Sequence, residues 1–234
     1  MSNNKPIPAD VVITAKEQDR WRKLWNGRDF LIESAGYIFP INEIKLRSKD
    51  GDAAISNLNG TGVKRIAILG TRELNAYTRE VTRQVVSEFR NDNAVIISGL
   101  AIGTDTMAHT VALDCGIPTV AVMATGIENI YPKQNEELAQ RIIDASNSAI
   151  MTTFPDGTKP QAIHFIDRIK TIVLMSDMLI IPACKEKGTA MVAARLANQW
   201  KIPVYAVPGR ITDATAKGCL QLIKEGLAQI WWGW

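Results

Sequence analysis

The stretch RIAILGTRELNAYTREVTRQVVSEFRNDNAVIISGLAIGTD, residues 65–105, decides the fold. Two short runs of aliphatic and β-branched residues, RIAIL and AVIIS, are each followed by a turn of glycine and small residues. Between the runs, Val81, Val85 and Phe89 recur at a spacing of four. This spacing predicts a helix over about 77–90 with one buried face. The order of strand, helix and strand is typical of a βαβ unit in a parallel sheet.

The same alternation continues to the end of the chain and predicts six strands. Most are continuous apolar runs, as expected of strands covered by helices on both faces. The predicted strands are 65–69, 94–98, 119–123, 149–154, 178–182 and 204–208. Further helices are predicted over about 106–114, after Asn135 as a capping residue, and over about 166–175, 190–200 and 220–227. Right-handed crossovers then give an α/β, Rossmann-like doubly wound fold with a mainly parallel sheet and a crevice at the carboxyl ends of its strands.

The beginning of the chain has a different pattern. Residues 1–62 are predicted to form a short N-terminal helical appendage and a linker, and residues 63–234 one Rossmann-like domain. The stretch AKEQDRWRKLWNGRDFL predicts an amphipathic helix, followed by an extended piece around 37–44. Residues 45–62 are small, polar and glycine-containing, so a loop is expected there. The appendage is expected to pack on the main sheet.

Composition narrows the class of protein without giving its function. Apolar residues make up 46% of the chain and charged residues 22%, which is typical of a globular protein. No apolar run is long enough to span a membrane and the first residues are polar, so we expect a cytoplasmic protein with no membrane contact. The net charge of +3 permits an anionic partner. Three cysteines and two histidines show no metal-ligand spacing, so we expect no metal, and the cysteines are interpreted as small core residues.

Three predicted strands run into glycine-containing turns: LGTRE at 69–73, SGLAIGTD at 98–105 and ATGIENIYP at 124–132. Such a turn exposes backbone N–H groups at the positive end of the next helix, which suits phosphate oxygens. Glycine can equally serve a tight turn or close helix packing. Neither the dinucleotide pattern GxGxxG nor the pattern GxxxxGK followed by Ser or Thr is present, which disfavours a Rossmann dehydrogenase and a P-loop ATPase.

Five motifs in order carry a resemblance to a known family: GTR, SGLAIGTDTMAH, ATGIENIYPKQNEEL, KGTAMVAARLA and YAVPGRITDATAKGCLQLIKEGL. Over about 65–230 the chain resembles the DprA/Smf (DNA-processing protein A) family, whose domain carries a GSR turn, SGLARGID, a YP loop and a terminal AVPG segment. The resemblance implies a non-catalytic protein without cofactors that binds single-stranded DNA, forms homodimers and helps load a RecA-type recombinase. The winged helix of many members is not evident here.

The resemblance also implies which residues meet DNA. Arg72 is expected to hold a phosphate through its planar guanidinium, Tyr131 to stack on a base, and Lys133 to extend a positive charge over the crevice. Structural alternatives remain open, namely a solvated loop arginine, a packed tyrosine, and a helix-capping role for Ser98 that Thr104 and Asp105 fit better. The implied nucleic-acid-binding residues are Arg72, Ser98, Gly99, Gly103, Gly126, Tyr131, Lys133, Arg168, Lys170, Gly188 and Thr189.

The chain departs from the family pattern at several donors. Ile102 stands in place of an arginine, Asp167 and Ile169 in place of an arginine and an asparagine, and Pro182 in place of a glutamate. Each lost charge-assisted bond costs about 1.5–3 kcal/mol. The sequence therefore predicts weaker DNA binding than the family pattern would give, or a shifted DNA path.

Two other functions remain open. Phosphoribohydrolases of nucleotide metabolism share this type of sheet, but Val192 occupies the position of their catalytic glutamate, which disfavours hydrolysis. Asp105 and His109 lie one helical turn apart, and a helix cap and a structural hydrogen bond are preferred over a catalytic pair. A sensor that binds a nucleotide-derived signal is the second alternative.

Overall fold

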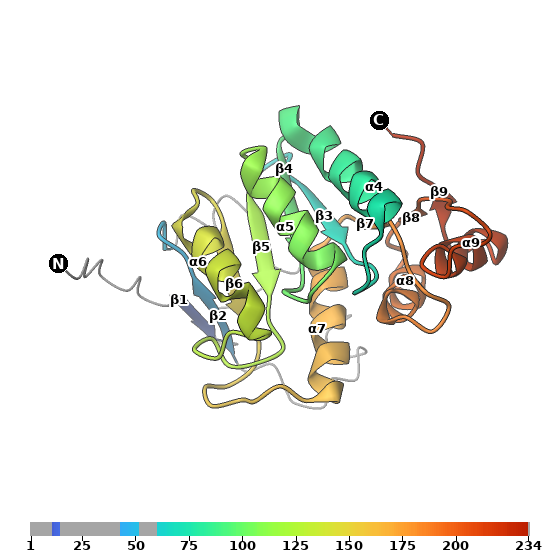
Figure 1. Ribbon diagram of the computed structural model, residues 1–234. Helices are drawn as coiled ribbons and strands as arrows, with labels where there is room; N and C mark the ends of the chain where they lie inside the picture. Colours follow the sequence, from blue (N-terminus) through green and yellow to red (C-terminus); the bar gives the residue numbers. More distant parts are fainter. Residues whose placement is uncertain (1–10, 15–42, 52–59, 234) are drawn as a thin grey trace.

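The computed structural model describes residues 11–14, 43–51 and 60–233, which together form one nine-stranded sheet covered by helices (Figure 1). The strands follow the order β1-β2-β6-β5-β4-β3-β7-β8-β9. β1 and β2 are antiparallel to their neighbours, and all other pairs are parallel. The strands are β1 (Val11–Thr14), β2 (Glu43–Arg47), β3 (Lys64–Ile68), β4 (Ala94–Ser98), β5 (Thr119–Val122), β6 (Ala149–Thr152), β7 (Met178–Ile181), β8 (Val204–Ala206) and β9 (Gln229–Ile230).

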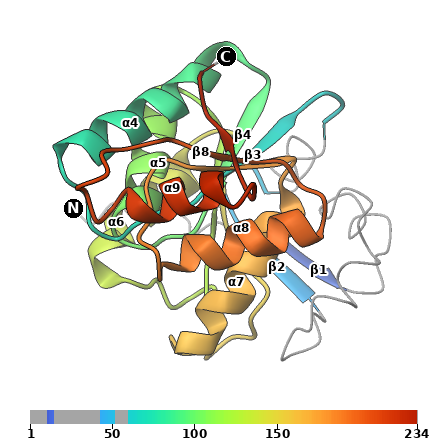
Figure 2. The same cartoon turned by 90° about the vertical axis from the view of Figure 1, so that its right-hand side faces the viewer.

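Helices cover both faces of the sheet. α4, α5 and α6 lie on one face, and α7, α8 and α9 pack into the core of the other (Figure 2). Short 3-10 helices at Glu88–Asn91 and Lys133–Asn135 extend α4 and lead into α6. The helices are α4 (Ala76–Ser87), α5 (Thr104–Asp114), α6 (Glu136–Asp144), α7 (Ala162–Met175), α8 (Thr189–Gln199) and α9 (Lys217–Lys224). The predicted doubly wound α/β fold is confirmed.

All six predicted strands are present as β3 to β8, but the predicted strand number was too low. The loop expected at 45–62 was partly wrong, because β2 occupies its first three residues and pairs with β6. Ile44 and Leu46 are buried, whereas Lys45 and Arg47, which alternate with them, are less so. This alternation marks a strand with two different faces, and its charged residues concealed it among polar neighbours. The predicted amphipathic helix lies outside the described residues.

The start of α6 corrects a second expectation. Glu136 and Glu137 stand in its first turn as predicted, but the side chain of Asn135 does not cap it. The Asn135 amide instead donates to the Leu100 carbonyl at 2.8 Å and to the Thr106 hydroxyl at 2.9 Å. These bonds satisfy a buried polar group and fix the start of α6 against the turn between β4 and α5.

The centre of the sheet contains its topological switch point. From β3 the chain proceeds outward through β4, β5 and β6, and it then returns to place β7 on the opposite side of β3. The turns after β3 and β7 therefore lead to helices on opposite faces. Adjacent parallel strands whose connections diverge in this way leave a crevice at their carboxyl ends, where ligands of doubly wound sheets bind.

Candidate functional site

A small hollow, partly open to solvent, lies at this switch point. Its lining comes from both halves of the sheet: the turns after β3 and β4, one face of α7, and the start of α8. The residues that line it are Leu69, Gly70, Arg72, Ala101, Asp105, Phe165, Arg168, Ile169, Thr189 and Ala190. Two arginines, one carboxyl group and one aromatic ring thus share a small concave surface.

The turn after β3 holds Arg72 at the rim of the hollow. The Thr71 N–H donates to the Ala183 carbonyl at 2.9 Å, and the Thr71 carbonyl accepts from the Thr104 N–H at 3.0 Å. Gly103, with a φ of +97°, packs so closely on this turn that a Cβ would collide with the Thr71 carbonyl and the Arg72 Cα. Arg72 itself is exposed, and its guanidinium carbon lies 5.8 Å from the centre of the Phe165 ring.

Arg168 reaches the same ring from within α7. Its guanidinium carbon lies 5.3 Å from the Phe165 ring centre, and its side chain is only 7% exposed. Arg168 Nη2 lies 3.7 Å from a carboxylate oxygen of Asp105, while Arg168 Nε has no hydrogen-bond partner among the described residues. The close approach requires Gly99, because a Cβ there would stand 2.6 Å from the guanidinium carbon.

Burial shifts the proton affinity of this pair. Desolvation raises the pKa of Asp105, and Arg168, the N–H of Ala101 and Arg72 oppose that rise. Desolvation lowers the pKa of Arg168, which Asp105 opposes and Arg72 reinforces. Two positive groups thus face one buried carboxyl group, an arrangement in which an added anion gains from both arginines.

His109 makes structural hydrogen bonds next to the site. Its Nε2 bonds the Gly99 carbonyl, which can only accept, so Nε2 carries the proton. Its Nδ1 lies 2.7 Å from the Thr119 hydroxyl. Burial lowers the pKa of His109 to about 4. The imidazole is therefore neutral near pH 7 and bonded to structural partners, in agreement with the predicted structural role and without a contact that would couple it to Asp105.

The implied DNA-binding residues at the strand ends separate into two groups. Thr189 lines the hollow beside Arg72 and Arg168, and Gly188 precedes it as the residue before α8. Ser98 is fully buried and donates to the Ile68 carbonyl at 2.6 Å, so its hydroxyl lies inside the sheet. The helix-capping alternative was wrong for the whole turn, because no side chain caps α5.

The loop after β5 contributes an aromatic side chain. Tyr131 is 43% exposed and its ring lies 5.9 Å from that of Phe165. Lys133 is 76% exposed, and its Nζ lies 3.9 Å from a carboxylate oxygen of Glu136. Gly126 is buried beneath the loop against Glu128. Of these loop residues, the structure brings Tyr131 to the aromatic centre of the site and leaves Lys133 and Gly126 off the lining of the hollow.

The departures from the family pattern lie around this centre. Ile102 is 47% exposed, where an arginine would have reached solvent. Asp167 is buried, and its carboxylate lies 2.9 Å from Lys170 Nζ. Lys170 is therefore directed toward Asp167 on the same helix, and it is not among the residues that line the hollow. Ile169 adds an apolar wall.

The prediction from sequence did not single out Phe165, although this ring touches Arg72, Arg168 and Tyr131. A signal was available, because Phe165 and Arg168 are three residues apart and share one face of a helix. In the described part of the chain, no group of His, Cys, Asp and Glu is arranged to hold a metal ion. No helix there is long and apolar enough to cross a membrane.

Comparison with known proteins gives consistent matches. A family model described as DNA recombination-mediator protein A matches residues 51–233. DNA processing protein DprA of Bacillus subtilis is 35% identical over 168 residues, which are 72% of this chain and 56% of that protein. DprA of Streptococcus pneumoniae is 31% identical over 170 residues, 73% of this chain and 59% of that protein. The match thus spans less than two thirds of the length of either relative.

Two solved structures share the fold and show recognisable sequence similarity. The X-ray structure of DprA from Streptococcus pneumoniae has a TM-score of 0.78 at 25% identity and covers 97% of this chain and 71% of that one. A structure of DNA processing protein A from Helicobacter pylori has a TM-score of 0.72 at 26% identity and covers 83% and 84%. The latter is described in terms of that protein's single-stranded DNA binding mode.

Proposed function

Because the chain belongs to the family of DNA recombination-mediator protein A, we propose that its crevice binds single-stranded DNA. The relative from Helicobacter pylori, studied for this activity, supports the proposal. The observation that carries it in this chain is the centre of the hollow, where Arg72 and Arg168 lie within 6 Å of one aromatic ring. Guanidinium groups hold phosphates and aromatic rings stack on bases, and single-strand binders combine both.

In this proposal, a phosphate enters between the two arginines. Arg168 has an unused Nε, and its counter-ion Asp105 lies at 3.7 Å rather than at hydrogen-bonding distance. The start of α8 at Thr189 adds the positive end of a helix dipole. Phe165 and Tyr131 form the surface on which a neighbouring base stacks. Gly99 and Gly103 allow the turns to pack closely against Arg168 and Arg72. Ser98 stabilises the adjacent strands through its hydrogen bond to the Ile68 carbonyl.

The exposed Ile102 sets the expected strength. An arginine at this position would have supplied another phosphate contact, and its absence removes about 1.5–3 kcal/mol. Lys133 and Lys170 are already close to Glu136 and Asp167, so each offers a strand less charge than an unpaired lysine would. We therefore expect affinity in the micromolar range at low salt.

We further propose the biological role that the family resemblance implies. In this role the protein protects single-stranded DNA and helps to load a RecA-type recombinase onto it, acting as a homodimer and without catalysing a reaction. The apolar stretch around 204–230 is the proposed dimer contact. Sedimentation in dilute buffer tests the dimer, and a monomer at micromolar concentration would contradict it.

Binding of a fluorescent oligothymidine, followed by anisotropy, tests the central proposal. Affinity is expected to fall steeply as salt increases, because phosphate contacts release counter-ions. The absence of binding at low salt, both by the wild-type chain and by a covalently linked dimer, would overturn the proposal. Turnover of a nucleoside monophosphate that is lost on substitution of Arg168 would instead favour a nucleotide enzyme.

A further inference from the structure

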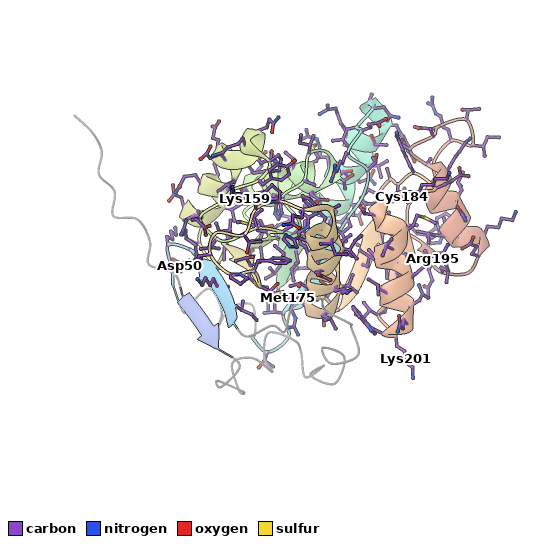
Figure 3. The ribbon with its side chains drawn as sticks, turned by 90° about the horizontal axis from the view of Figure 1, so that it is seen from below. Asp50, Lys159, Met175, Cys184, Arg195 and Lys201 are labelled. Atoms are coloured by element: carbon purple, nitrogen blue, oxygen red, sulfur yellow. The ribbon has the colours of Figure 1, made fainter. Side chains whose placement is uncertain are left out.

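Three sulfur atoms gather beneath the loop that joins β7 to α8. Cys184 Sγ lies 3.7 Å from Cys219 Sγ and 3.9 Å from Met191 Sδ. Both cysteines are buried, with exposed fractions of 1% or less. Figure 3 shows Cys184 at one end of α8 and Lys201 near the other. The two thiols are 35 residues apart in sequence and belong to different elements, so their contact is a product of the fold.

The backbone around the thiol pair connects it to the candidate site. The Cys184 carbonyl accepts from the Gly218 N–H at 2.9 Å, which joins the loop to the start of α9. The preceding carbonyl, that of Ala183, accepts from Thr71 in the turn that holds Arg72. A Cβ on Gly218 would stand 2.6 Å from Cys184 Sγ, so α9 packs directly on this sulfur. The loop of Cys184 is therefore bonded to the turn that holds Arg72, and five residues further along the chain it reaches Thr189, which lines the hollow.

We propose that Cys184 and Cys219 form an oxidation site that closes to an intramolecular disulfide. A disulfide requires a sulfur separation of about 2.05 Å. Closure from 3.7 Å therefore draws the loop of Cys184 and the start of α9 together. Gly188 and Thr189 follow on the same loop, so we further propose that closure moves the start of α8 and weakens DNA binding. This second step rests on the proposed function.

The oxidant in this proposal is hydrogen peroxide, a small two-electron oxidant. One thiol loses its proton and attacks the peroxide, whose O–O bond breaks to give a sulfenic acid and water. The second sulfur, after losing its proton, attacks the first, the S–O bond breaks, and a second water leaves. Both sulfurs end as the disulfide and hydrogen peroxide is reduced to two waters.

The surroundings determine the rate of this reaction. The hydrogen bond with Cys219, together with burial, raises the pKa of the Cys184 thiol. Because the thiolate is the nucleophile, oxidation is expected to be slow near pH 7 and faster at higher pH. Cys115 offers an internal control, since it is half-buried beside Ser87 at the end of α5, on the opposite face of the sheet.

Peroxide treatment of the folded Cys115→Ser chain tests the site itself, because only the pair remains. After the peroxide is removed and the chain is unfolded in guanidinium, we expect both thiols to be absent from titration with Ellman's reagent, with a linked Cys184–Cys219 peptide two hydrogens lighter and no intermolecular dimer. Dithiothreitol should restore both thiols. Thiols that persist in folded protein at pH 9, sulfinic acid without a linked peptide, or cross-linked dimers would overturn the proposal. A Cys184→Ser, Cys115→Ser chain is the matched control.

The effect on DNA is measured by oligothymidine anisotropy with the same sample before oxidation, after it, and after reduction. Oxidation is expected to weaken binding about two- to fivefold, the loss expected when a phosphate no longer meets a helix N-terminus. Unchanged affinity after confirmed disulfide formation would overturn the regulatory step. A reduced chain that binds no oligothymidine would overturn the proposed function instead, while the peptide mass still decides whether the disulfide forms.

Discussion

At the scale of single residues, the site depends on two arginines that reach one ring from separate elements. Arg72 is exposed on a turn, whereas Arg168 is buried and faces Asp105. The two arginines therefore differ in what they add. Arg168 belongs to the wall, so its substitution is expected to lower the free energy of unfolding. Arg72 is exposed, so its removal gives up only the contact with the Phe165 ring.

Arg72→Ala is expected to weaken oligothymidine binding about tenfold, because it removes one charge-assisted phosphate contact worth about 1.5 kcal/mol. The free energy of unfolding should remain within about 0.5 kcal/mol of wild type, since the side chain is exposed. Anisotropy and urea unfolding measure the two quantities. Arg79→Ala, an exposed change on α4, is the control for net charge. Equal affinity of both variants would remove Arg72 from the site.

His109 gives the protein a defined response to acid. The unfolded imidazole takes up a proton near pH 6.5 and the folded one only near pH 4, so the unfolded state binds more protons between these values. The free energy of unfolding therefore has its full contribution from His109 above about pH 6.5. This contribution falls by about 3 kcal/mol as the pH decreases toward 4. Asp105 acts in the opposite direction. Its pKa is raised in the folded state, so its contribution to the free energy of unfolding increases as the pH falls.

Urea unfolding between pH 4 and 7 is expected to show this loss in the wild type and not in His109→Gln, with Asp105 common to both. NMR titration of the His109 ring offers a direct measurement. An imidazole that titrates near pH 6.5 in the folded chain would contradict the structure of the Gly99 and Thr119 contacts.

At the scale of elements, glycines determine how closely the turns approach. Gly103 has positive φ and packs on the turn of Arg72, whereas Gly116 has positive φ of +71° with no atom within 4 Å of a Cβ. Gly103→Ala is expected to cost at least about 3 kcal/mol, from backbone strain and collision together. Gly116→Ala should cost about 1–2 kcal/mol, from backbone strain alone. Thermal unfolding compares them, and equal losses would show that the collision relaxes freely.

The elements that could be predicted from sequence are those with a strong local pattern. β4 is a continuous apolar run, and α6 carries Leu138, Ile142 and Ile143 at helical spacing, so both were located within a few residues. β2 was predicted only at its first two residues, as the end of the extended piece around 37–44, because its two buried residues alternate with charged ones and its partner β6 lies about a hundred residues away. A pairing of that range leaves no local signal.

The site shows the same division. The turns that carry Arg72 and Gly99 are marked by glycine, so their place at the strand ends could be expected. The role of Phe165 depends on α7 crossing to the opposite face, and the bonds of Asn135 depend on the β4–α5 turn lying beside α6. Such contacts between distant segments require the assembled structure.

At the scale of the whole molecule, β2 makes the beginning of the chain part of the core. Ile44 and Leu46 are buried in the cluster that contains α7 and α8, and Lys45 Nζ lies 2.6 Å from Asp156. A chain beginning at residue 60 is therefore expected to unfold with about 3–6 kcal/mol less free energy than one beginning at residue 43, from the two lost side chains. Equal urea midpoints and slopes for the two would contradict this role.

Residues 153–161 connect β6 to α7 and so join the half of the sheet that ends at β3 to the half formed by β7, β8 and β9. This single connection is a natural place to divide the protein into two fragments. The segment before it supplies Arg72 and Asp105, and the segment after it supplies Phe165, Arg168 and Thr189. A cut there yields two fragments, neither of which contains a complete crevice. A ligand that contacts both fragments would favour their reassembly. Under the proposed function, the two fragments therefore become a reporter that gives a signal only where single-stranded DNA is present.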